Sequence, residues 1–234
     1  MKNIVTKIDD LVPVRNALIS VSDKAGLEGF VPELLKICPK VRILSTGGTF
    51  DKLKELLGAK AGKRLLQVSD YTGQPETQGG LVKTLDFKIY LGLLTETYNK
   101  AHQGDLKRTK AAPIDMVVVN LYPFQATVAK PGVTLEEARA NIDIGGPCMI
   151  RASAKNYLRV ASVVDPADYK KILAELKKNG GKTSLKLRFG LARKAFAHTA
   201  DYDAAIAAFL GKQDPAGVGK AYPELVKKER LRPR

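Results

Sequence analysis

Five short apolar runs, separated by stretches with helical periodicity, constrain the fold of this chain more than any other feature. Most of the runs are rich in β-branched residues and nearly continuous, which is typical of parallel strands buried on both faces of a sheet. Strands that alternate with helices in this way predict an α/β fold. We expect a three-layer, doubly wound architecture around a mostly parallel sheet, with strands at Asn16–Val21, Val41–Leu44, Leu65–Val68, Met116–Asn120 and Val160–Val164.

Local signals mark helices between the strands. A helix through Phe50–Leu57 should end at Gly58, because glycine commonly terminates helices. Thr134 and Glu137 have the spacing of a capping box at a helix start. Pro32 interrupts the apolar pattern of its helix, so we expect that helix to kink or restart there.

The sequence predicts one domain with two flanking segments. We expect an N-terminal arm over residues 1–15, the domain over residues 16–211, and a basic C-terminal tail over residues 212–234. The stretch Gln213–Gly219 contains proline and glycine and separates the domain from the tail. We find no internal repeat.

Positive charge is concentrated toward the C-terminus. The formal net charge is +15, which favours anionic ligands. From Tyr169 onward the chain holds 16 Lys+Arg and 6 Asp+Glu, so this stretch carries most of the excess. It contains no recognisable nucleic-acid motif, and its basic residues lie mainly on the polar faces of expected helices. We therefore favour a solvated basic face that steers a phosphorylated substrate over a nucleic-acid surface.

The sequence gives no sign of a membrane or secreted protein. No apolar run approaches the ~20 residues needed to span a bilayer, and the first residues lack a signal-peptide core. Cys38 and Cys148 provide neither a disulfide framework nor the spacing of a zinc site. We expect a cytoplasmic protein without a bound metal.

Polar segments follow the expected strands, at the place where open α/β sheets bind ligands. Ser22 and Lys24 follow the first strand, and Thr46-Gly47-Gly48-Thr49 follows the second and leads into a helix. Hydroxyls, glycine N–H groups and a helix N-terminus together predict a phosphate site. The glycine spacing is that of neither a Walker loop nor a dinucleotide fingerprint, and a plain Gly-Gly turn is the alternative.

Two further segments supply candidate reactive groups. Lys83 and Thr84 follow a pair of glycines. Asn120 and Tyr122 lie at the end of the fourth strand, where the proline after Tyr122 keeps that residue extended. Tyr122 then presents its hydroxyl at the sheet edge, and a tyrosine packed beneath a turn is the alternative.

The stretch Asn141–Asn156 places a carboxylate before a helix. Asp143 precedes Ile144-Gly145-Gly146, whose glycines allow backbone N–H groups to approach a ligand at the helix N-terminus. Lys155 lies twelve residues after Asp143, about three helical turns away, and we expect both to border one cavity. A capped core helix with a surface Asp and Lys is the alternative.

Several of these segments together resemble IMP cyclohydrolase, the N-terminal domain of the bifunctional protein that also carries aminoimidazole carboxamide ribonucleotide (AICAR) transformylase. The similarity runs in one order from about Arg15 to Leu210. The blocks that carry it are Ser22–Lys24, Thr46–Thr49, Val82–Leu85, Asn120–Phe124, Val128–Thr134, Asn141–Asn156 and Lys194–Thr199.

The resemblance implies a methylglyoxal synthase-like fold and a stand-alone cyclohydrolase with no transformylase domain. The implied reaction closes 5-formamidoimidazole-4-carboxamide ribonucleotide (FAICAR) to IMP with loss of water, at the end of purine biosynthesis. It requires no metal, nicotinamide or folate. A separate AICAR transformylase is expected to supply the substrate, and the oligomeric state stays open, a homodimer included.

The resemblance also implies roles for individual residues. Asp143 would transfer the proton with help from Lys155, while Lys83 and the N–H groups of Ile144–Gly146 would stabilise the oxyanion. Tyr122 would orient the carboxamide, with Asn120 binding nearby. The phosphate would be bound by Ser22, Lys24, Thr46, Gly47, Gly48, Thr49 and Thr84.

Three positions depart from the family pattern. Leu81 replaces an arginine expected to touch phosphate, and Asp86 and Tyr90 replace histidines. A missing guanidinium removes a charge-assisted bond of roughly 1.5–3 kcal/mol unless another cation substitutes for it. The departures favour, as the main alternative, a non-catalytic module of the same fold that senses nucleotides. Methylglyoxal synthase is a weaker alternative, because that enzyme lacks the Asn120–Phe124 and Ile142–Gly146 blocks.

Overall fold

The structure is a computed structural model that describes residues 4–75, 77, 82–222 and 224. The chain divides into two compact units. The first consists of the residues up to Leu121 together with Asp143–Thr199, and the second consists of Tyr122–Ile142 together with the residues from Ala200 onward. The predicted boundaries at residues 15 and 211 stay predictions.

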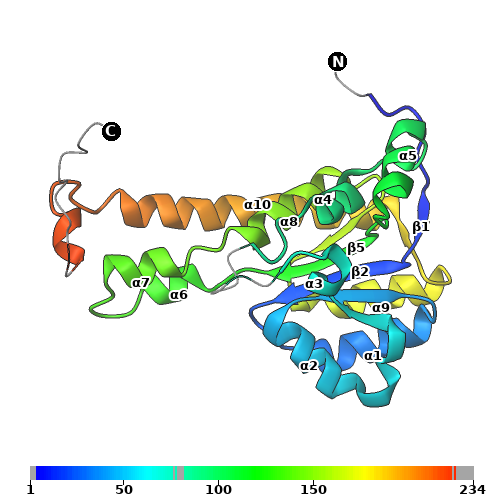
Figure 1. Ribbon diagram of the computed structural model, residues 1–234, viewed down its shortest axis with the longest axis horizontal. Coiled ribbons are helices and arrows are strands. Elements are labelled where there is room, and N and C mark those ends of the chain that lie inside the picture. Colours follow the sequence, from blue (N-terminus) through cyan, green and yellow to red (C-terminus); the bar gives the residue numbers. More distant parts are fainter. Residues whose placement is uncertain (1–3, 76, 78–81, 223, 225–234) are drawn as a thin grey trace, which may run out of the picture. The chain divides into compact units, whose positions relative to one another are not determined.

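A five-stranded parallel sheet forms the centre of the first unit (Figure 1). Its strand order is β4-β3-β2-β5-β6, and the predicted α/β fold with a parallel sheet is confirmed. In register, Leu18 of β2 lies opposite Leu44 of β3 and Val117 of β5. The strands are β2 (Asn16–Val21), β3 (Arg42–Ser45), β4 (Leu65–Gln67), β5 (Met116–Asn120) and β6 (Ala161–Val163).

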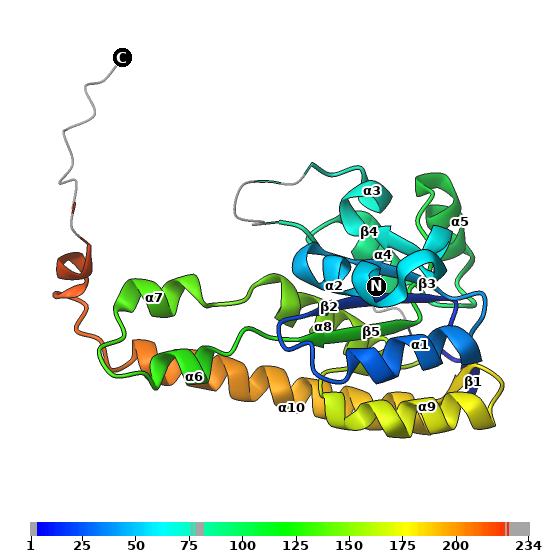
Figure 2. The same cartoon turned by 90° about the horizontal axis from the view of Figure 1, so that it is seen from below.

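Helices cover both faces of this sheet because its strands are apolar on both faces. Ala17 and Ile19 belong to a core cluster shared with α1 (Leu27–Ile37), α2 (Gly47–Leu57) and α9 (Tyr169–Lys178). Helices α1 and α9 lie side by side on that face (Figure 2). The other face is covered by α4 and α8, and α8 packs on β5 and β6. The bounds of these two helices are Phe87–Leu94 and Gly145–Lys155.

Two of the helix predictions have different outcomes. Helix α2 ends at Gly58 as predicted, where φ is 49°. The predicted restart at Pro32 is wrong, since α1 runs without interruption from Leu27 to Ile37, and the predicted kink stays a prediction. One missing backbone bond is outweighed there by apolar burial, because Phe30, Val31 and Leu34 are each at most 1% exposed.

Part of the expected N-terminal arm is a strand. β1 (Leu11–Pro13) pairs antiparallel with β7 (Lys182–Ser184). Next to this pair, the guanidinium of Arg188 is fully buried and donates to the carbonyl oxygens of Asp9, Asp10, Tyr157, Leu158 and Thr183. Burial lowers the pKa of Arg188 to about 10. Arg188 therefore holds the N-terminal arm against the rest of the first unit.

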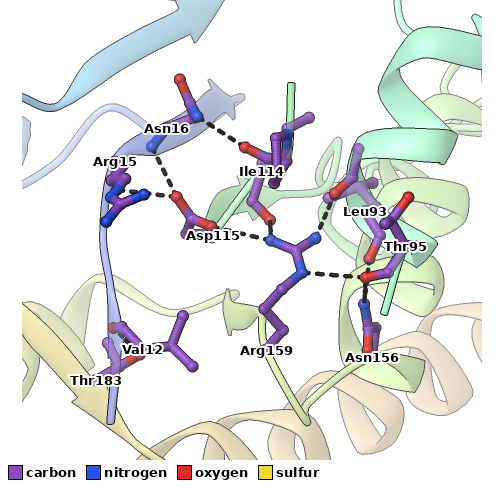
Figure 3. A network of polar contacts seen from close by, with 12 residues as sticks. Val12, Arg15, Asn16, Leu93, Thr95, Ile114, Asp115, Asn156, Arg159 and Thr183 are labelled. Atoms are coloured by element: carbon purple, nitrogen blue, oxygen red, sulfur yellow. Dashed lines mark hydrogen bonds and ion pairs between the residues drawn. The ribbon is translucent and has the colours of Figure 1, made fainter. Parts of the chain in front are cut away.

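The amino edge of the sheet contains a buried ion pair (Figure 3). Arg159 Nη1 lies 2.9 Å from Asp115 Oδ1, and both side chains are less than a tenth exposed. The other carboxylate oxygen accepts the backbone N–H groups of Arg15 and Asn16, each at 2.9 Å. Burial raises the pKa of Asp115 and lowers that of Arg159, while their mutual attraction opposes both shifts. The network joins β2, β5 and β6 at the ends opposite to the predicted site.

The remaining elements of the first unit are short, apart from one long helix that continues into the second unit. They are α3 (Val68–Thr72), α5 (Lys100–Thr109), the beginning of α10 (Leu185–Leu210) and 3₁₀ turns at Gly58–Lys60, Gly62–Arg64 and Pro166–Asp168. Within the described part of the chain, no helix is both long and apolar enough to span a membrane.

The second unit is helical. It contains α6 (Phe124–Val128), α7 (Leu135–Ala140), the end of α10 and a 3₁₀ turn at Val218–Ala221. The capping box predicted for Thr134 and Glu137 is confirmed at the start of α7. The ring of Phe124 packs edge-on against Tyr202 and Phe209.

Candidate functional site

The carboxyl edge of the sheet has a topological switch point between β2 and β5. These strands are neighbours, but the chain continues from β2 to one side of the sheet and from β5 to the other. Ligands of open α/β sheets bind in the crevice that such a reversal creates. The loops that follow β2, β3 and β5 carry the predicted residues.

Asn120 holds the loop after β2 against the end of β5. Its Oδ1 accepts the N–H groups of Ser22 at 2.6 Å and Asp23 at 2.9 Å, and its Nδ2 donates to the Asp23 carbonyl at 2.7 Å. Lys24 Nζ lies 3.4 Å from the carbonyl oxygen of Ser22. The Asn120 carboxamide thus shapes the loop that presents Ser22 and Lys24.

The loop after β3 opens helix α2 at a glycine. Gly47 has a φ of 43°, in the left-handed region that favours glycine. The N–H groups of Thr49 and Phe50 donate to the Thr46 carbonyl, and the N–H groups of Gly47 and Gly48, which come before the first helical bonds, are suited to a ligand. Thr46 Oγ1 is 2.8 Å from the Ser20 hydroxyl, which joins the ends of β3 and β2.

The hydroxyl of Thr49 is used within the protein. It accepts the Val21 N–H at 3.1 Å and donates to the Val21 carbonyl at 3.0 Å, and the residue is 3% exposed. The Thr49 hydroxyl therefore joins α2 to β2. The sequence had suggested instead that this hydroxyl binds phosphate.

We expect Thr49→Val to destabilise the fold by about 1–3 kcal/mol, because it keeps the side-chain shape but leaves two buried backbone groups of Val21 without partners. Denaturant unfolding measures the loss. Thr97→Val at an exposed position is the control and should stay within about 0.5 kcal/mol of the parent. An equal effect of the two substitutions would contradict the structural role of Thr49.

Lys83 and Thr84 lie close to the glycines at two helix starts. A β-carbon built on Gly47 would lie 3.3 Å from Lys83 Nζ, and one built on Gly145 would lie 2.8 Å from Thr84 Oγ1. Thr84 is buried and Lys83 is half-buried. The lysine therefore lies against the start of α2 and the threonine against the start of α8.

Asp143 lies at the same helix start as Thr84. Its Oδ1 accepts the Gly146 N–H at 2.9 Å. A β-carbon on Gly146 would lie 2.5 Å from Asp143 Oδ2 and 2.6 Å from Leu121 Cδ2. Only glycine fits between the carboxylate and Leu121, so the Gly145-Gly146 pair is explained by two close approaches.

The structure brings together Gly47, Lys83, Thr84, Asp143 and Gly145–Gly146. Two eleven-residue helices, α2 and α8, begin at these glycines. Helix N-termini attract negative charge, and the ammonium of Lys83 adds to that attraction. The chemistry of the group is that of an anion site with one carboxylate available for proton transfer.

The structure places Lys155 at the opposite end of α8 from Asp143, and a cavity bordered by both residues stays a prediction. Lys155 ends α8, so it is separated from Gly145 by the length of an eleven-residue helix, roughly 15 Å. The residue after it, Asn156, donates to the carbonyl oxygens of Leu93 and Thr95 in the amino-edge network (Figure 3). Because α8 is uninterrupted, the twelve-residue spacing in the sequence places Asp143 and Lys155 at opposite ends of one helix.

Tyr122 and Ile144 have exposed side chains. Tyr122 is 52% exposed and begins the second unit, so it is not packed beneath a turn. Ile144 is 59% exposed and precedes the first helical residue of α8.

Of the departures from the family pattern, Asp86 and Tyr90 lie in the described part of the chain. Asp86 caps α4 by accepting the Lys88 N–H at 2.7 Å. Tyr90 is half-buried near Cys148, and burial raises the pKa of its hydroxyl. Leu81, Gly79 and Gly80 lie outside the described residues.

The residues after β4 were not identified from the sequence. A cavity of about 10 Å³ lies between the loop after β3, the segment after β4 and Lys83. Its polar lining residues include Gln67, Ser69 and Gln74. The signal in the sequence was a polar residue, Gln67, at the end of an apolar strand.

Larger cavities open elsewhere on the described chain. One of about 350 Å³ lies beneath Ile4–Asp9, and one of about 450 Å³ lies beside Cys38 and Gly181. No predicted site residue lines either of them. Among the described residues, no group of three or more His, Cys, Asp or Glu side chains is arranged to hold a metal ion.

Comparison with known proteins gives two family matches. Residues 26–148 match the model of the MGS-like domain, and residues 153–232 match the model of the AICARFT/IMPCHase bienzyme.

Individual relatives agree with these matches. The bifunctional purine biosynthesis protein PurH of Magnetococcus marinus is 49% identical over 214 residues, which are 92% of this chain and 39% of that protein. PurH of Neisseria gonorrhoeae is 51% identical over 197 residues, which are 84% of this chain and 36% of that protein. The chain thus spans about two fifths of the length of these relatives.

A solved structure is similar over nearly its whole length. The crystal structure of a protein called ForH superposes with a TM-score of 0.70 at 31% identity. The match covers 84% of this chain and 98% of that one.

Proposed function

The chain belongs to the family of MGS-like domains, and from this premise we propose that it is an IMP cyclohydrolase acting in purine biosynthesis. The proposed substrate is FAICAR, and the products are IMP and water. The substrate would come from a formyl-transfer step of the kind named in the bienzyme family model.

Ring closure joins two groups of one molecule. The carboxamide nitrogen loses a proton and attacks the formyl carbon, and the formyl oxygen takes up the negative charge. This oxygen leaves as water after it gains two protons, one from the carboxamide and one from the formamido N–H, which is lost as the ring C=N bond forms. An enzyme gains much of the rate by holding the two groups in contact. It must also remove a proton from a weakly nucleophilic amide, stabilise the oxyanion and protonate the leaving oxygen.

We assign the proton transfer to Asp143. Its Oδ1 is held by the Gly146 N–H, and this bond orients the carboxylate at the start of α8. A carboxylate oriented in this way serves as the base toward the carboxamide and can return the proton to the leaving oxygen. The single observation that carries the assignment is the close approach of Asp143 to Gly146, which leaves no room for a β-carbon.

We assign oxyanion stabilisation to Lys83 and to the N–H groups at the start of α8. Lys83 reaches this edge from the turn at residues 82–84, and its ammonium lies against Gly47 at the start of α2, so its charge also faces the proposed phosphate site. Positive charge and N–H groups fixed before the reaction cost no reorganisation when the oxyanion forms.

We assign the 5′-phosphate to the start of α2. The N–H groups of Gly47 and Gly48 bind it there, with Thr46, Thr84, Ser22 and Lys24 around it. Thr49 and Asn120 hold these loops in place through backbone bonds. Tyr122 is proposed to orient the carboxamide. Lys155 has no role in this proposal within one chain.

Two other functions share the fold. A nucleotide-sensing module would use the phosphate site without turnover, and a methylglyoxal synthase would act on dihydroxyacetone phosphate. The carboxylate at the start of α8 favours the cyclohydrolase, because sensing requires no base at that position.

An assay with three arms tests the proposal. The purified chain is supplied with FAICAR, with dihydroxyacetone phosphate, or with IMP alone in a binding measurement. We expect IMP to form from FAICAR at a rate proportional to protein, with no methylglyoxal from the second substrate. Binding of IMP without turnover of FAICAR would contradict the enzyme and support the sensor.

A further inference from the structure

Gln74 carries a buried oxygen that no described residue uses. Its carboxamide Oε1 is shielded from solvent and has no hydrogen-bond partner among the described residues. The backbone at this point is well held, because the Gln74 N–H donates to Thr72 Oγ1 at 3.1 Å and that hydroxyl donates to the Val68 carbonyl at 3.0 Å. Burying an unbonded amide oxygen is costly, so a donor is expected beside it.

The space beside Gln74 is polar and very small. The cavity of about 10 Å³ that Gln74 lines is also lined by Lys83, Thr46, Gln67 and Ser69. A cavity of roughly 10–15 Å³ holds one water molecule when it offers two to four polar partners. The space is far too small for a nucleotide, and its lining provides the partners that one water needs.

Lys83 is the donor on the other side of this space. Its ammonium lies against Gly47, and no described carboxylate forms an ion pair with it. A lysine ammonium has three donors on a flexible four-carbon chain, so its direction must be fixed by neighbours. Gln74 offers an acceptor across the cavity.

We propose that Gln74 is a positioning residue that holds the ammonium of Lys83 through one water molecule in this cavity. The carboxamide oxygen of Gln74 accepts from the water, and the water accepts from Lys83. The ammonium is thereby kept at the start of α2, facing the substrate. The expected effect of Gln74 on catalysis rests on the proposed function. The contact between Gln74 and Lys83 rests only on the cavity and on the unbonded oxygen.

Gln74→Met tests the contact, because methionine has nearly the same length but offers no comparable acceptor. We expect kcat for FAICAR to fall about tenfold, the equivalent of 1.4 kcal/mol, while KM changes less than about twofold. Gln74→Glu restores an acceptor and should keep kcat near the parent. Gln103→Met, at an exposed position on α5, is the matched control and should leave both constants unchanged.

A second readout does not need turnover. Lysine-selective ¹H–¹⁵N spectra follow the ammonium protons of Lys83, assigned with Lys83→Arg. We expect these protons to exchange with solvent at least about tenfold faster in Gln74→Met than in the parent, because the ammonium loses the water that links it to Gln74 and tenfold corresponds to about 1.4 kcal/mol. Gln74→Glu and Gln103→Met should exchange like the parent. Thermal melting of each variant establishes that it is folded.

The outcomes separate this inference from the proposed function. Parent-like ammonium exchange in folded Gln74→Met would overturn the inference, whatever the activity. If the parent chain failed to convert FAICAR, the proposed function would fall, and the exchange measurement would still decide whether Gln74 holds Lys83. A tenfold rise in KM with unchanged kcat would also overturn the inference, since Gln74 would then bind substrate directly.

Discussion

Asp143→Asn is expected to lower the turnover of FAICAR by about 10²–10⁴-fold, the range for loss of a positioned general base. Asparagine keeps the shape of the side chain and an oxygen that accepts the Gly146 N–H. What it loses is the ability to take the carboxamide proton. The loss should therefore appear in kcat, measured by the formation of IMP, while the affinity for IMP in a calorimetric titration changes little.

The matched control for this substitution is Asp51→Asn, at an exposed position of α2. It removes the same charge without touching the site and should leave kcat within about twofold of the parent. If Asp143→Asn converted FAICAR as fast as Asp51→Asn, Asp143 would be a loop residue that only caps α8.

Asp115→Ala is expected to destabilise the fold by about 3–5 kcal/mol, which is the usual cost of removing one partner from a buried ion pair. Arg159 would remain buried without its carboxylate, and the N–H groups of Arg15 and Asn16 would lose their acceptor. Denaturant unfolding measures the change as a lower midpoint at an unchanged slope.

Glu55→Ala is the comparison for the buried pair. Glu55 forms an exposed pair with Lys52 at 3.2 Å, and pairs of this kind contribute about 0–1 kcal/mol. Equal losses for Asp115→Ala and Glu55→Ala would show that the amino-edge network adds nothing beyond a surface pair. The two substitutions also separate stability from chemistry, because neither residue belongs to the proposed site.

The sheet was predictable because its strands are continuous apolar runs. The bounds of β2 and β5 agree with the prediction residue for residue, since both strands are buried on both faces. The pair β1 and β7 was not predicted, because β7 (Lys182–Ser184) is polar and β1 ends at a proline, so neither is a continuous apolar run. The predicted restart at Pro32 does not occur, because the burial of α1 outweighs one missing hydrogen bond.

The candidate site was predictable in its parts but not in its contacts. Glycines at two helix starts marked the loops, but only the fold shows that Lys83 lies against one of them and Thr84 against the other. Asn120 and Thr49 have residue types that suit a ligand, yet their side chains bond the backbone. The position of Lys155 could not be predicted, because a spacing along the sequence does not tell which end of a helix faces the site. Gln74 was missed because a polar residue in a connecting segment has no periodic signal.

A crystal structure of the chain with bound IMP tests the central claim most directly. The account predicts the 5′-phosphate within hydrogen-bond distance of the Gly47 and Gly48 N–H groups. It also predicts the closed ring beside Asp143 and Lys83, at the edge where α2 and α8 begin. Phosphate bound along the basic face of α9, or in the cavity beside Cys38 and Gly181, would contradict the site and the mechanism built on it.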